Sequence, residues 1–316
     1  MLGVILDADS LGKEIDLSPI TELLDEWRVF GSTLSKETAA RIADADVILS
    51  NKVRLDAANL CDSRASLISV MATGTNNVDL EYTSKHRIIV CNAIAYATPS
   101  VVQHTVSLIL ALSTSLPAYL KDVGNGEWQK SNVFCMLRHP IQEIAGKQLG
   151  IVGYGELGRA VAAASTALGL EILISDRPGW SAPRKDRLKF DDVVRKADYL
   201  SLHCPLTEMN KGMISADVLS AMKNSSFLIN TARGGLVDSS ALIAALAAGE
   251  ISGAALDVLD IEPPLADEPL INDIDNLLVT PHNAWGAVES RRRLIDQMRE
   301  NIKGFLSEKP IRRVNK

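Results

Sequence analysis

The chain has 316 residues, 47% of them hydrophobic, which indicates about two domains with enough apolar side chains for buried cores. Its formal net charge of −6 argues against nucleic acid or an anionic membrane surface as a partner. The four cysteines form neither a CxxC motif nor a disulfide framework, so we expect a cytoplasmic protein. The N-terminal MLGVILDAD is interpreted as a strand and not as a signal peptide, and the longest apolar stretch, near residues 105–116, is too short to span a bilayer.

Residues 1 to about 98 alternate short apolar segments with helical patterns, which predicts an α/β domain. The predicted strands are VILDAD, DVILSN, ASLISVMA and RIIVCN, and the predicted helices are SPITELLDEW and SKETAARIADA. The loop ATGTNN follows a buried strand, and Gly74 would permit a turn whose backbone amides hold a carboxylate. An ordinary turn is the alternative.

A long helix is predicted next, with Thr98 as its N-cap and Pro99 at its first position. Its sequence, SVVQHTVSLILALSTSL, is apolar on most sides, so we expect it to be buried between domains or between subunits. The last helix of the chain, VESRRRLIDQMRENIKGFL, has Ile295, Met298, Ile302 and Phe305 on one face. The arginine run 291–293 is expected on the solvated face of that helix.

The run QLGIVGYGELGRAVAAASTALGLEILISD indicates a strand, a glycine turn, a helix and a second strand, the arrangement that binds a dinucleotide. Gly153 would permit the tight turn, Gly155 would let the backbone approach a pyrophosphate, and Gly158 would allow close packing of helix on strand. The predicted buried face of the helix comprises Leu157, Val161, Ala164 and Leu168.

Asp176 ends the second strand of this run, 18 residues after Gly158. An acidic side chain near that position binds the hydroxyls of the adenine ribose, so NAD is the predicted cofactor. Arg177 follows directly and would accept a 2′-phosphate, which keeps NADP as the alternative.

Three later apolar segments each lead to a polar residue of different chemistry: FLINTA to Arg233, ALDVLDI to Glu262, and NLLVTP to His282. Parallel strands deliver their last residues to one edge of a sheet, so we expect the three side chains to converge. Arginine binds a carboxylate with two parallel donors, histidine exchanges a proton near neutral pH, and glutamate holds the imidazole in one tautomer. Reversible reduction of a 2-oxo acid requires these groups, although each residue taken alone also fits a structural role.

An ordered set of segments resembles the D-isomer-specific 2-hydroxyacid dehydrogenases nearly from end to end: SNKVRLDAANL, ATGTNNVDL, TPSVVQHT, AGKQLGIVGYGELG, LHCPLT, NTARGGLVD, DVLDIEPP and TPHNAWG. Within this family, VVQHT and TPHNAWG resemble the glycerate dehydrogenase (hydroxypyruvate reductase) branch. The resemblance implies an α/β fold of two Rossmann-like/flavodoxin-like doubly wound domains with a cleft between them. It also implies that residues 1–98 and 286–316 form the substrate-binding domain and residues 99–285 the NAD-binding domain, because the family's last helix returns to the first domain.

The same resemblance implies the roles of individual residues. Arg233 would bind the substrate carboxylate and keto oxygen, His282 would be the acid and base, and Glu262 would support His282. Asp257 would bind the nicotinamide carboxamide. The expected substrate contacts are Lys52, Thr73, Gly74, Arg233, His282 and Trp285. The expected cofactor contacts are Thr73, Thr105, Gly153, Gly155, Glu156, Leu157, Gly158, Asp176, His203, Cys204, Pro205, Asn210, Thr231, Ala232, Arg233, Asp257, His282 and Ala284. No metal site is predicted, because no histidine or cysteine spacing fits one.

The expected reaction is hydride transfer between NAD(H) and a small D-2-hydroxy acid/2-oxo acid pair, in the first place D-glycerate and hydroxypyruvate. A homodimer through the helix near residues 100–120 is expected as well. The alternatives are a reductase of glyoxylate, pyruvate or 3-phosphohydroxypyruvate, a corepressor-like dinucleotide sensor, and a phosphatase with Asp7 as nucleophile and Asp9 as acid in VILDADS.

Two features depart from the family pattern. Glu156 stands in the glycine turn where many relatives have arginine, which brings a negative charge near the expected pyrophosphate. Near the substrate side, MLRHP carries Arg138 and His139, whose effect on substrate choice the sequence does not define.

Overall fold

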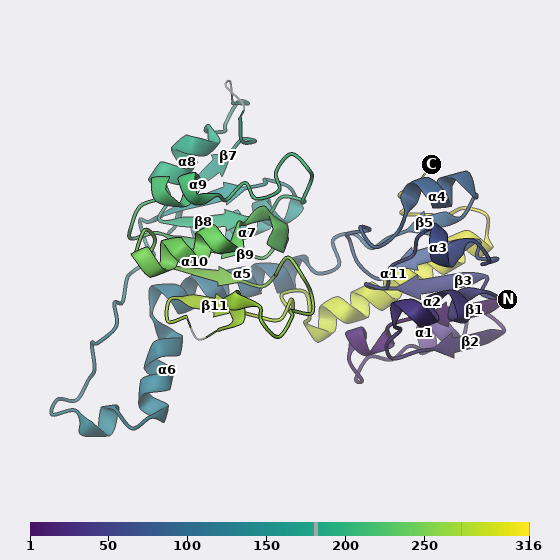
Figure 1. The fold of residues 1–316 in the computed structure, drawn as a ribbon, viewed down its shortest axis with the longest axis horizontal. Helices are drawn as coiled ribbons and strands as arrows, with labels where there is room; N and C mark the ends of the chain where they lie inside the picture. Colours follow the sequence, from purple (N-terminus) through teal and green to yellow (C-terminus); the bar gives the residue numbers. More distant parts are fainter. Residues whose placement is uncertain (180–182, 273, 316) are drawn as a thin grey trace. The chain divides into compact units, whose positions relative to one another are not determined.

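Two parallel β-sheets organise the chain in the computed structural model, which describes residues 1–179, 183–272 and 274–315 (Figure 1). One sheet belongs to residues 1–97 with 286–316, here called unit 1, and the other to residues 98–285, called unit 2. Each sheet carries helices, so the predicted fold class of two Rossmann-like α/β domains is confirmed.

The described sheet of unit 1 has the order β2-β1-β3-β4-β5 and is parallel throughout. Its strands are β1 Leu2–Ile5, β2 Glu26–Val29, β3 Val47–Ser50, β4 Leu67–Val70 and β5 Ile89–Cys91. Its helices are η1 Ala8–Leu11 (a 3-10 helix), α1 Ser18–Thr21, α2 Ser35–Ile42, α3 Ala57–Leu60, α4 Leu80–Lys85 and α11 Val288–Leu306. The four predicted strands correspond to β1, β3, β4 and β5 and are confirmed. Their order places the topological switch point between β1 and β3.

The helix predicted over residues 18–27 is wrong in its second half. Helix α1 ends at Thr21, and Glu26 and Trp27 belong to strand β2, which pairs with β1. The physical reason is a close packing contact, because a Cβ on Gly3 would lie 2.5 Å from the Trp27 ring. The glycine in β1 thus makes room for the tryptophan of the neighbouring strand.

Helix α11 belongs to unit 1 and packs against α1 and β4. Ile295, Met298 and Ile302 are buried in it, and Phe305 is half-buried. The prediction for the arginine run is wrong at two of its three positions. Arg291 donates to the carbonyl oxygens of Gly286 and Leu11, and Arg293 donates to that of Tyr96, so both guanidinium groups tie α11 to other segments of unit 1.

The described sheet of unit 2 has the order β11-β10-β9-β8-β6-β7. Its strands are β6 Gln148–Val152, β7 Glu171–Ser175, β8 Tyr199–Leu202, β9 Phe227–Asn230, β10 Gly253–Leu256 and β11 Leu277–Val279. Beyond β7, Leu188 forms an isolated parallel bridge with Ser175 in the place of a further strand. If that bridge is counted as a strand, the order is that of a Rossmann sheet, with its switch point between β6 and β8.

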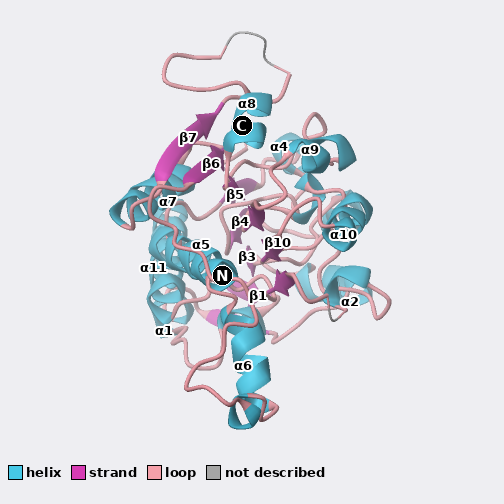
Figure 2. Cartoon of the chain, turned by 90° about the vertical axis from the view of Figure 1, so that its left-hand side faces the viewer, coloured by secondary structure: helices cyan, strands magenta, loops and turns pink. Residues whose placement is uncertain are grey.

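Helices cover both faces of the sheet of unit 2. They are α5 Thr98–Ser113, α6 Leu116–Gly124, α7 Glu156–Ala167, α8 Phe190–Lys196, α9 Ala216–Ala221 and α10 Ser239–Ala248, with the 3-10 helices η2 Trp128–Lys130, η3 Gly234–Leu236 and η4 Pro269–Ile271. The core formed by α5 and α7 is separate from the core formed by α8, α9 and α10. Figure 2 shows α5 and α7 on one side of the strands and α9 and α10 on the other.

The buried face of helix α7 differs from the predicted one, because it is shifted around the helix by about one residue. Val161 is buried as predicted, but Leu157 and Ala164 are only half-buried and Leu168 is exposed. The buried residues beside Val161 are Gly158, Ala162 and Ser165. The helix turns its smallest side chains to the sheet because it lies close to the glycine turn that precedes it.

The apolar helix predicted after Thr98 is divided at Ser115, which has a left-handed backbone conformation. Leu108, Ile109 and Leu112 of α5 pack in the core of unit 2, which accounts for much of that helix's hydrophobicity. No single described helix has both the length and the apolar composition of a membrane span, and the pair α5 and α6 reaches them only together, across a bend of 65°.

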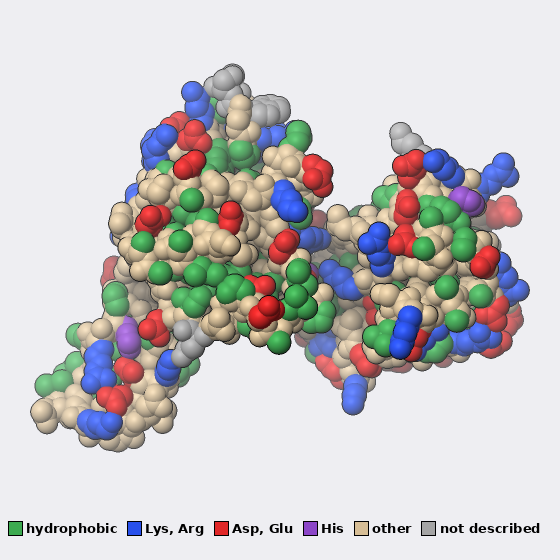
Figure 3. Space-filling view, in the orientation of Figure 1, with side chains coloured by type: hydrophobic (Ala, Val, Ile, Leu, Met, Phe, Trp, Pro, Cys, Tyr) green, Lys and Arg blue, Asp and Glu red, His purple; other side chains and the backbone are tan. Residues whose placement is uncertain are grey.

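Residues 116–141, here called the arm, extend from unit 2 and contain α6 and η2 (Figure 1). Its exposed hydrophobic residues are Leu116, Leu120, Val123, Trp128, Val133, Phe134, Leu137 and Ile141. Figure 3 shows hydrophobic side chains beside charged ones at the end of the arm. So many exposed apolar side chains on one segment are typical of an interaction surface.

Candidate functional site

The turn after β6 brings three backbones into contact. Gly153 has φ +98°, and a Cβ there would lie 2.6 Å from the backbone of His203 and Cys204, at the end of β8. A Cβ on Gly158 would lie 2.0 Å from the carbonyl oxygen of Gly153. A Cβ on Gly155 would meet nothing within 4 Å, so the space beside the first turn of α7 is open to a ligand. Amide groups and the helix dipole favour a phosphate there.

Glu156 is the first residue of α7, and its exposed carboxylate accepts a hydrogen bond from the hydroxyl of Thr98, the first residue of α5. The carboxylate is thereby held to the start of a neighbouring helix of the same unit. Leu157, the next residue of α7, is half-buried.

Asp176 follows β7 and is covered by the loop that succeeds it. Its carboxylate accepts hydrogen bonds from the Arg184 guanidinium, with Nη2 at 2.5 Å and Nε at 3.1 Å, and from the backbone amides of Arg177 and Arg184. The hydrogen bonds from Arg184 hold the pKa of the Asp176 carboxyl well below its usual range. The Asp176 carboxylate, which is expected to bind a ribose, is therefore ionised and already paired with Arg184.

The strand end after β8 carries His203, whose Nε2 shares a hydrogen bond of 2.8 Å with the Ser201 hydroxyl. Nδ1 of His203 is buried and has no hydrogen-bond partner among the described residues. Burial lowers the pKa of this imidazole to about 4. The ring is therefore neutral at physiological pH.

The loop after His203 is organised by Asn210. Its side-chain amide donates to the carbonyl oxygen of Pro205 at 2.8 Å, and its oxygen accepts from the amide of Thr207 at 2.7 Å. Burial raises the pKa of the neighbouring Cys204 thiol to about 11, so this cysteine stays protonated.

Thr105 and Thr231 lie in the interior of unit 2. The Thr105 hydroxyl is fully buried, donates to the carbonyl oxygen of Val101 and lies 3.1 Å from the hydroxyl of Thr231. This pairing joins α5 to the end of β9, so both hydroxyls have structural partners.

Arg233 follows β9 in a turn that Asn230 shapes. The buried Asn230 side chain accepts from the amide of Ala232 and donates to the carbonyl oxygen of Arg233. A Cβ on the next residue, Gly234, would lie 2.0 Å from the carbonyl carbon of Leu259. Only glycine allows this approach, and it brings the loop after β9 against the loop after β10.

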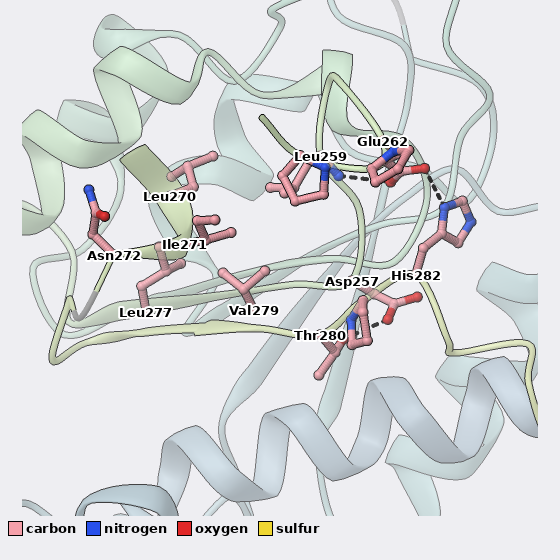
Figure 4. A pocket seen from close by; sticks show the side chains of 13 residues that line it. Asp257, Leu259, Glu262, Leu270, Ile271, Asn272, Leu277, Val279, Thr280 and His282 are labelled. Carbon is pink, nitrogen blue, oxygen red and sulfur yellow. Dashed lines mark hydrogen bonds and ion pairs between the residues drawn. The ribbon is translucent and has the colours of Figure 1, made fainter. Parts of the chain in front are cut away.

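Glu262 and His282 lie on the loops after β10 and β11 and form a hydrogen-bonded pair (Figure 4). Oε2 of Glu262 lies 2.6 Å from Nδ1 of His282, and Oε1 accepts from the amide of Leu259 at 2.9 Å. An ionised carboxylate can only accept, so Nδ1 carries the proton in this bond and Nε2 is left for another partner. Both side chains retain some exposure, 30% for Glu262 and 25% for His282.

The loop that carries His282 is wrapped around the buried carboxylate of Asp257. That carboxylate accepts from the Thr280 hydroxyl at 2.6 Å and from the amides of Asn283 and Ala284 at 3.0 and 2.9 Å. His104, on α5, lies 2.9 Å from Oγ1 of Thr280. Sequence reasoning placed His104 in an apolar helix and missed this contact, because nothing local to α5 indicates Thr280.

Trp285 holds the same loop from its other end, since its indole N–H donates to the carbonyl oxygen of His282 at 2.9 Å. Beside the Glu262–His282 pair lies a pocket of about 580 Å³, whose apolar wall includes Leu270, Leu277 and Val279 (Figure 4). Glu262 and His282 themselves line this pocket, together with Thr280.

The substrate candidates of unit 1 lie at the carboxyl ends of its strands. Lys52 is exposed after β3, and Thr73 and Gly74 lie in the loop after β4. Asp7, after β1, accepts from the amides of Asn51, Lys52 and Val53.

Asp7 thus serves to hold the loop that carries Lys52. Burial raises the pKa of the Asp7 carboxyl, against the opposing effect of these amide hydrogen bonds. A carboxylate that is buried and bound by three backbone amides is unsuited to nucleophilic attack, which argues against the phosphatase alternative.

Comparison with known proteins defines the family. Residues 106–284 match the D-isomer specific 2-hydroxyacid dehydrogenase, NAD binding domain. The chain is 40% identical over 288 residues to the glycerate dehydrogenase of Methylorubrum extorquens, covering 90% of each chain. It is 32% identical over 303 residues to the hydroxypyruvate reductase of Blautia hydrogenotrophica, covering 93% of this chain and 94% of the relative.

Among solved structures, a D-lactate dehydrogenase from Aquifex aeolicus, complexed with NAD and lactic acid, matches with a TM-score of 0.83 at 27% identity, covering 98% of this chain and 96% of that one. The chain belongs to the D-isomer-specific 2-hydroxyacid dehydrogenase family, and unit 2 contains the NAD-binding domain of that family. The open space at Gly155 beside the first turn of α7 fits the pyrophosphate of such a cofactor.

The neutral His203 predicts an acid-labile contribution to stability. Its pKa is about 4 in the folded protein against 6.5 in a model compound, so below pH 6.5 the unfolded chain takes up the proton first. The free energy of unfolding should fall by at most about 3 kcal/mol between pH 6.5 and 4 because of this residue. The His203→Gln variant should lose that decline in urea unfolding measured at several pH values.

The control for this experiment is His86→Gln, on the exposed surface at the end of α4. Its pH profile should follow that of the unsubstituted protein. Parallel profiles for His203→Gln and the unsubstituted protein would refute the role of His203.

Proposed function

We propose that this protein is an NAD-dependent reductase of small 2-oxo acids that interconverts hydroxypyruvate and D-glycerate. The observation that carries this proposal is the hydrogen-bonded Glu262–His282 pair at the strand ends of an NAD-binding unit, next to the strand end of Arg233. The choice of substrate is supported by the 40% identity to a glycerate dehydrogenase.

His282 is the proposed proton donor and acceptor. Because Glu262 accepts a hydrogen bond from the Nδ1–H group, Nε2 is left to exchange a proton with the oxygen of the substrate. When bound, the nicotinamide supplies or receives the hydride at the neighbouring carbon. Protonation by His282 then neutralises the oxygen anion that develops during reduction.

Arg233 is the proposed carboxylate-binding residue. Its planar guanidinium provides two parallel donors, which match a carboxylate better than the single charge of a lysine. The turn that Asn230 and Gly234 shape holds its backbone at the end of β9. Lys52, Thr73, Gly74 and Trp285 remain predictions for the rest of the substrate site.

The reaction is tested by following the absorbance of NADH and NADPH with hydroxypyruvate, glyoxylate, pyruvate and 3-phosphohydroxypyruvate. We expect hydroxypyruvate with NADH to give the highest kcat/KM. A higher kcat/KM for another oxo acid would support the proposed reaction class and contradict hydroxypyruvate as the substrate. Binding of NADH without turnover of any oxo acid would refute the proposed reductase activity and favour the dinucleotide-sensing alternative.

Substitutions in the pair test the mechanism. His282→Gln should lower kcat about 10²- to 10⁴-fold, the usual contribution of a general acid, while the Kd of NADH stays within about twofold. Glu262→Gln should reduce kcat less and change its pH profile, because the imidazole loses the charged partner that orients it. The control His86→Gln should leave kcat unchanged. Full activity of His282→Gln would remove this residue from the mechanism.

We also propose that the arm mediates a homodimer. Its exposed apolar side chains include Phe134 at 90%, Leu137 at 78% and Leu120 at 63% exposure. Burial of such side chains against a second copy would be favourable by about 25 cal/mol per Å² of apolar surface. The expected interface therefore lies farther along the chain than the buried part of α5.

The dimer is tested by small-angle scattering and sedimentation. The unsubstituted protein should have twice the mass of its chain, and the double variant Phe134→Glu/Leu137→Glu should be monomeric. The matched control is Met209→Glu, which changes a side chain of 91% exposure outside the arm and should leave the dimer intact. A monomer without any substitution would contradict the proposal.

A further inference from the structure

Asp176 has an unusual partner for a carboxylate expected to bind a ribose. Arg184 contacts both of its oxygens, with Nε at 3.1 Å from each and Nη2 at 2.5 Å from Oδ1. The amide of Arg177 lies 2.8 Å from Oδ1, and the amide of Arg184 lies 2.7 Å from Oδ2. These five contacts occupy the acceptor positions of both oxygens, so ribose hydroxyls need at least one of them to be released.

The guanidinium is the contact that can be released. The Asp176 side chain has no exposure, whereas the Arg184 side chain is 46% exposed and covers it from outside. The backbone of the loop is held separately, because the amide of Asp176 donates to the carbonyl oxygen of Leu188 and the amide of Leu188 donates to that of Ile174. The side chain of Arg184 can therefore rotate away while the loop stays anchored.

The same segment is strongly cationic in an otherwise acidic chain. Residues 177–189 contain five lysine and arginine residues and one aspartate, while the whole chain has a net charge of −6. One of these cations, Arg187, lies over the ring of Tyr154 in the glycine turn, with its Cζ 6.0 Å from the ring centroid. The positive charge is thus gathered next to the expected dinucleotide site, where a phosphate group would be favoured.

We propose that Arg184 determines the dinucleotide specificity of this enzyme. In the free protein its guanidinium is hydrogen-bonded to the Asp176 carboxylate. With NADH it leaves the carboxylate to the 2′- and 3′-hydroxyls of the adenine ribose, and with NADPH it remains near Asp176, neutralises it and binds the 2′-phosphate. The pair therefore lowers the affinity for NADH and raises that for NADPH, so that both cofactors are accepted. This inference rests on the proposed use of a nicotinamide dinucleotide.

The test measures the binding of ligands that cannot undergo turnover. Calorimetry gives the Kd of ADP-ribose and of 2′-phospho-ADP-ribose, which carry the adenine half of the two cofactors without the nicotinamide. In Arg184→Gln, ADP-ribose should bind more tightly and 2′-phospho-ADP-ribose more weakly. The ratio of the two Kd values should shift about tenfold or more, the effect of one lost charge-assisted hydrogen bond. Arg184→Lys keeps the charge without the two-pronged contact. Its ratio of Kd values should lie between that of the unsubstituted protein and that of Arg184→Gln.

Arg195→Gln is the matched control, because Arg195 lies on α8 outside residues 177–189, its side chain is 61% exposed and it pairs with Asp192 of the same helix. It should leave the affinity for ADP-ribose unchanged. An unchanged ratio in Arg184→Gln, or equal weakening of both ligands, would overturn the role of Arg184 and leave the proposed function standing. Failure of the unsubstituted protein to bind either ligand would overturn the proposed function itself.

Discussion

The buried carboxylate of Asp257 is the interaction on which the site depends. The loop after β11 turns sharply at His282, whose φ of +50° lies in the left-handed region that side chains other than glycine adopt at a cost of about 1 kcal/mol. The Thr280 hydroxyl and two backbone amides of this loop donate to Asp257, which offsets that cost. The loop is thus folded so that the imidazole meets Glu262. Without the carboxylate, these three donors would lose their acceptor.

Three carboxylates at strand ends show how the same group serves different purposes. Asp7 and Asp257 are bound mainly by backbone amides, which cannot leave unless the loop itself unfolds. Asp176 is bound in addition by the side chain of Arg184, which can move without unfolding the backbone. Burial alone therefore does not distinguish a structural carboxylate from one that binds a ligand. The kind of partner differs, because Asp176 is held by an exposed guanidinium as well as by backbone amides, which agrees with the ligand-binding role proposed for it.

Local sequence patterns were enough for the elements that are stabilised locally. The strands β1, β3, β4 and β5 are apolar runs bounded by polar residues, and the helix after the glycine turn begins where the turn ends. The order of the motifs was enough to recognise the family. The placement of Arg233, Glu262 and His282 after neighbouring strands could also be predicted, because parallel strands present their last residues at one edge. Of the three, the structure joins Glu262 to His282 by a hydrogen bond.

The sequence by itself therefore determined the fold class, the family and the chemical groups available at the carboxyl edge of the second sheet. The tertiary structure alone decided which partners those groups have. Strand β2 depends on the contact of Trp27 with Gly3, and the buried face of α7 depends on its approach to Gly153. The contacts of Arg184 with Asp176 and of His104 with Thr280 join side chains on different segments. Such contacts follow no local periodicity, because they are set by which segments the folded backbone brings together.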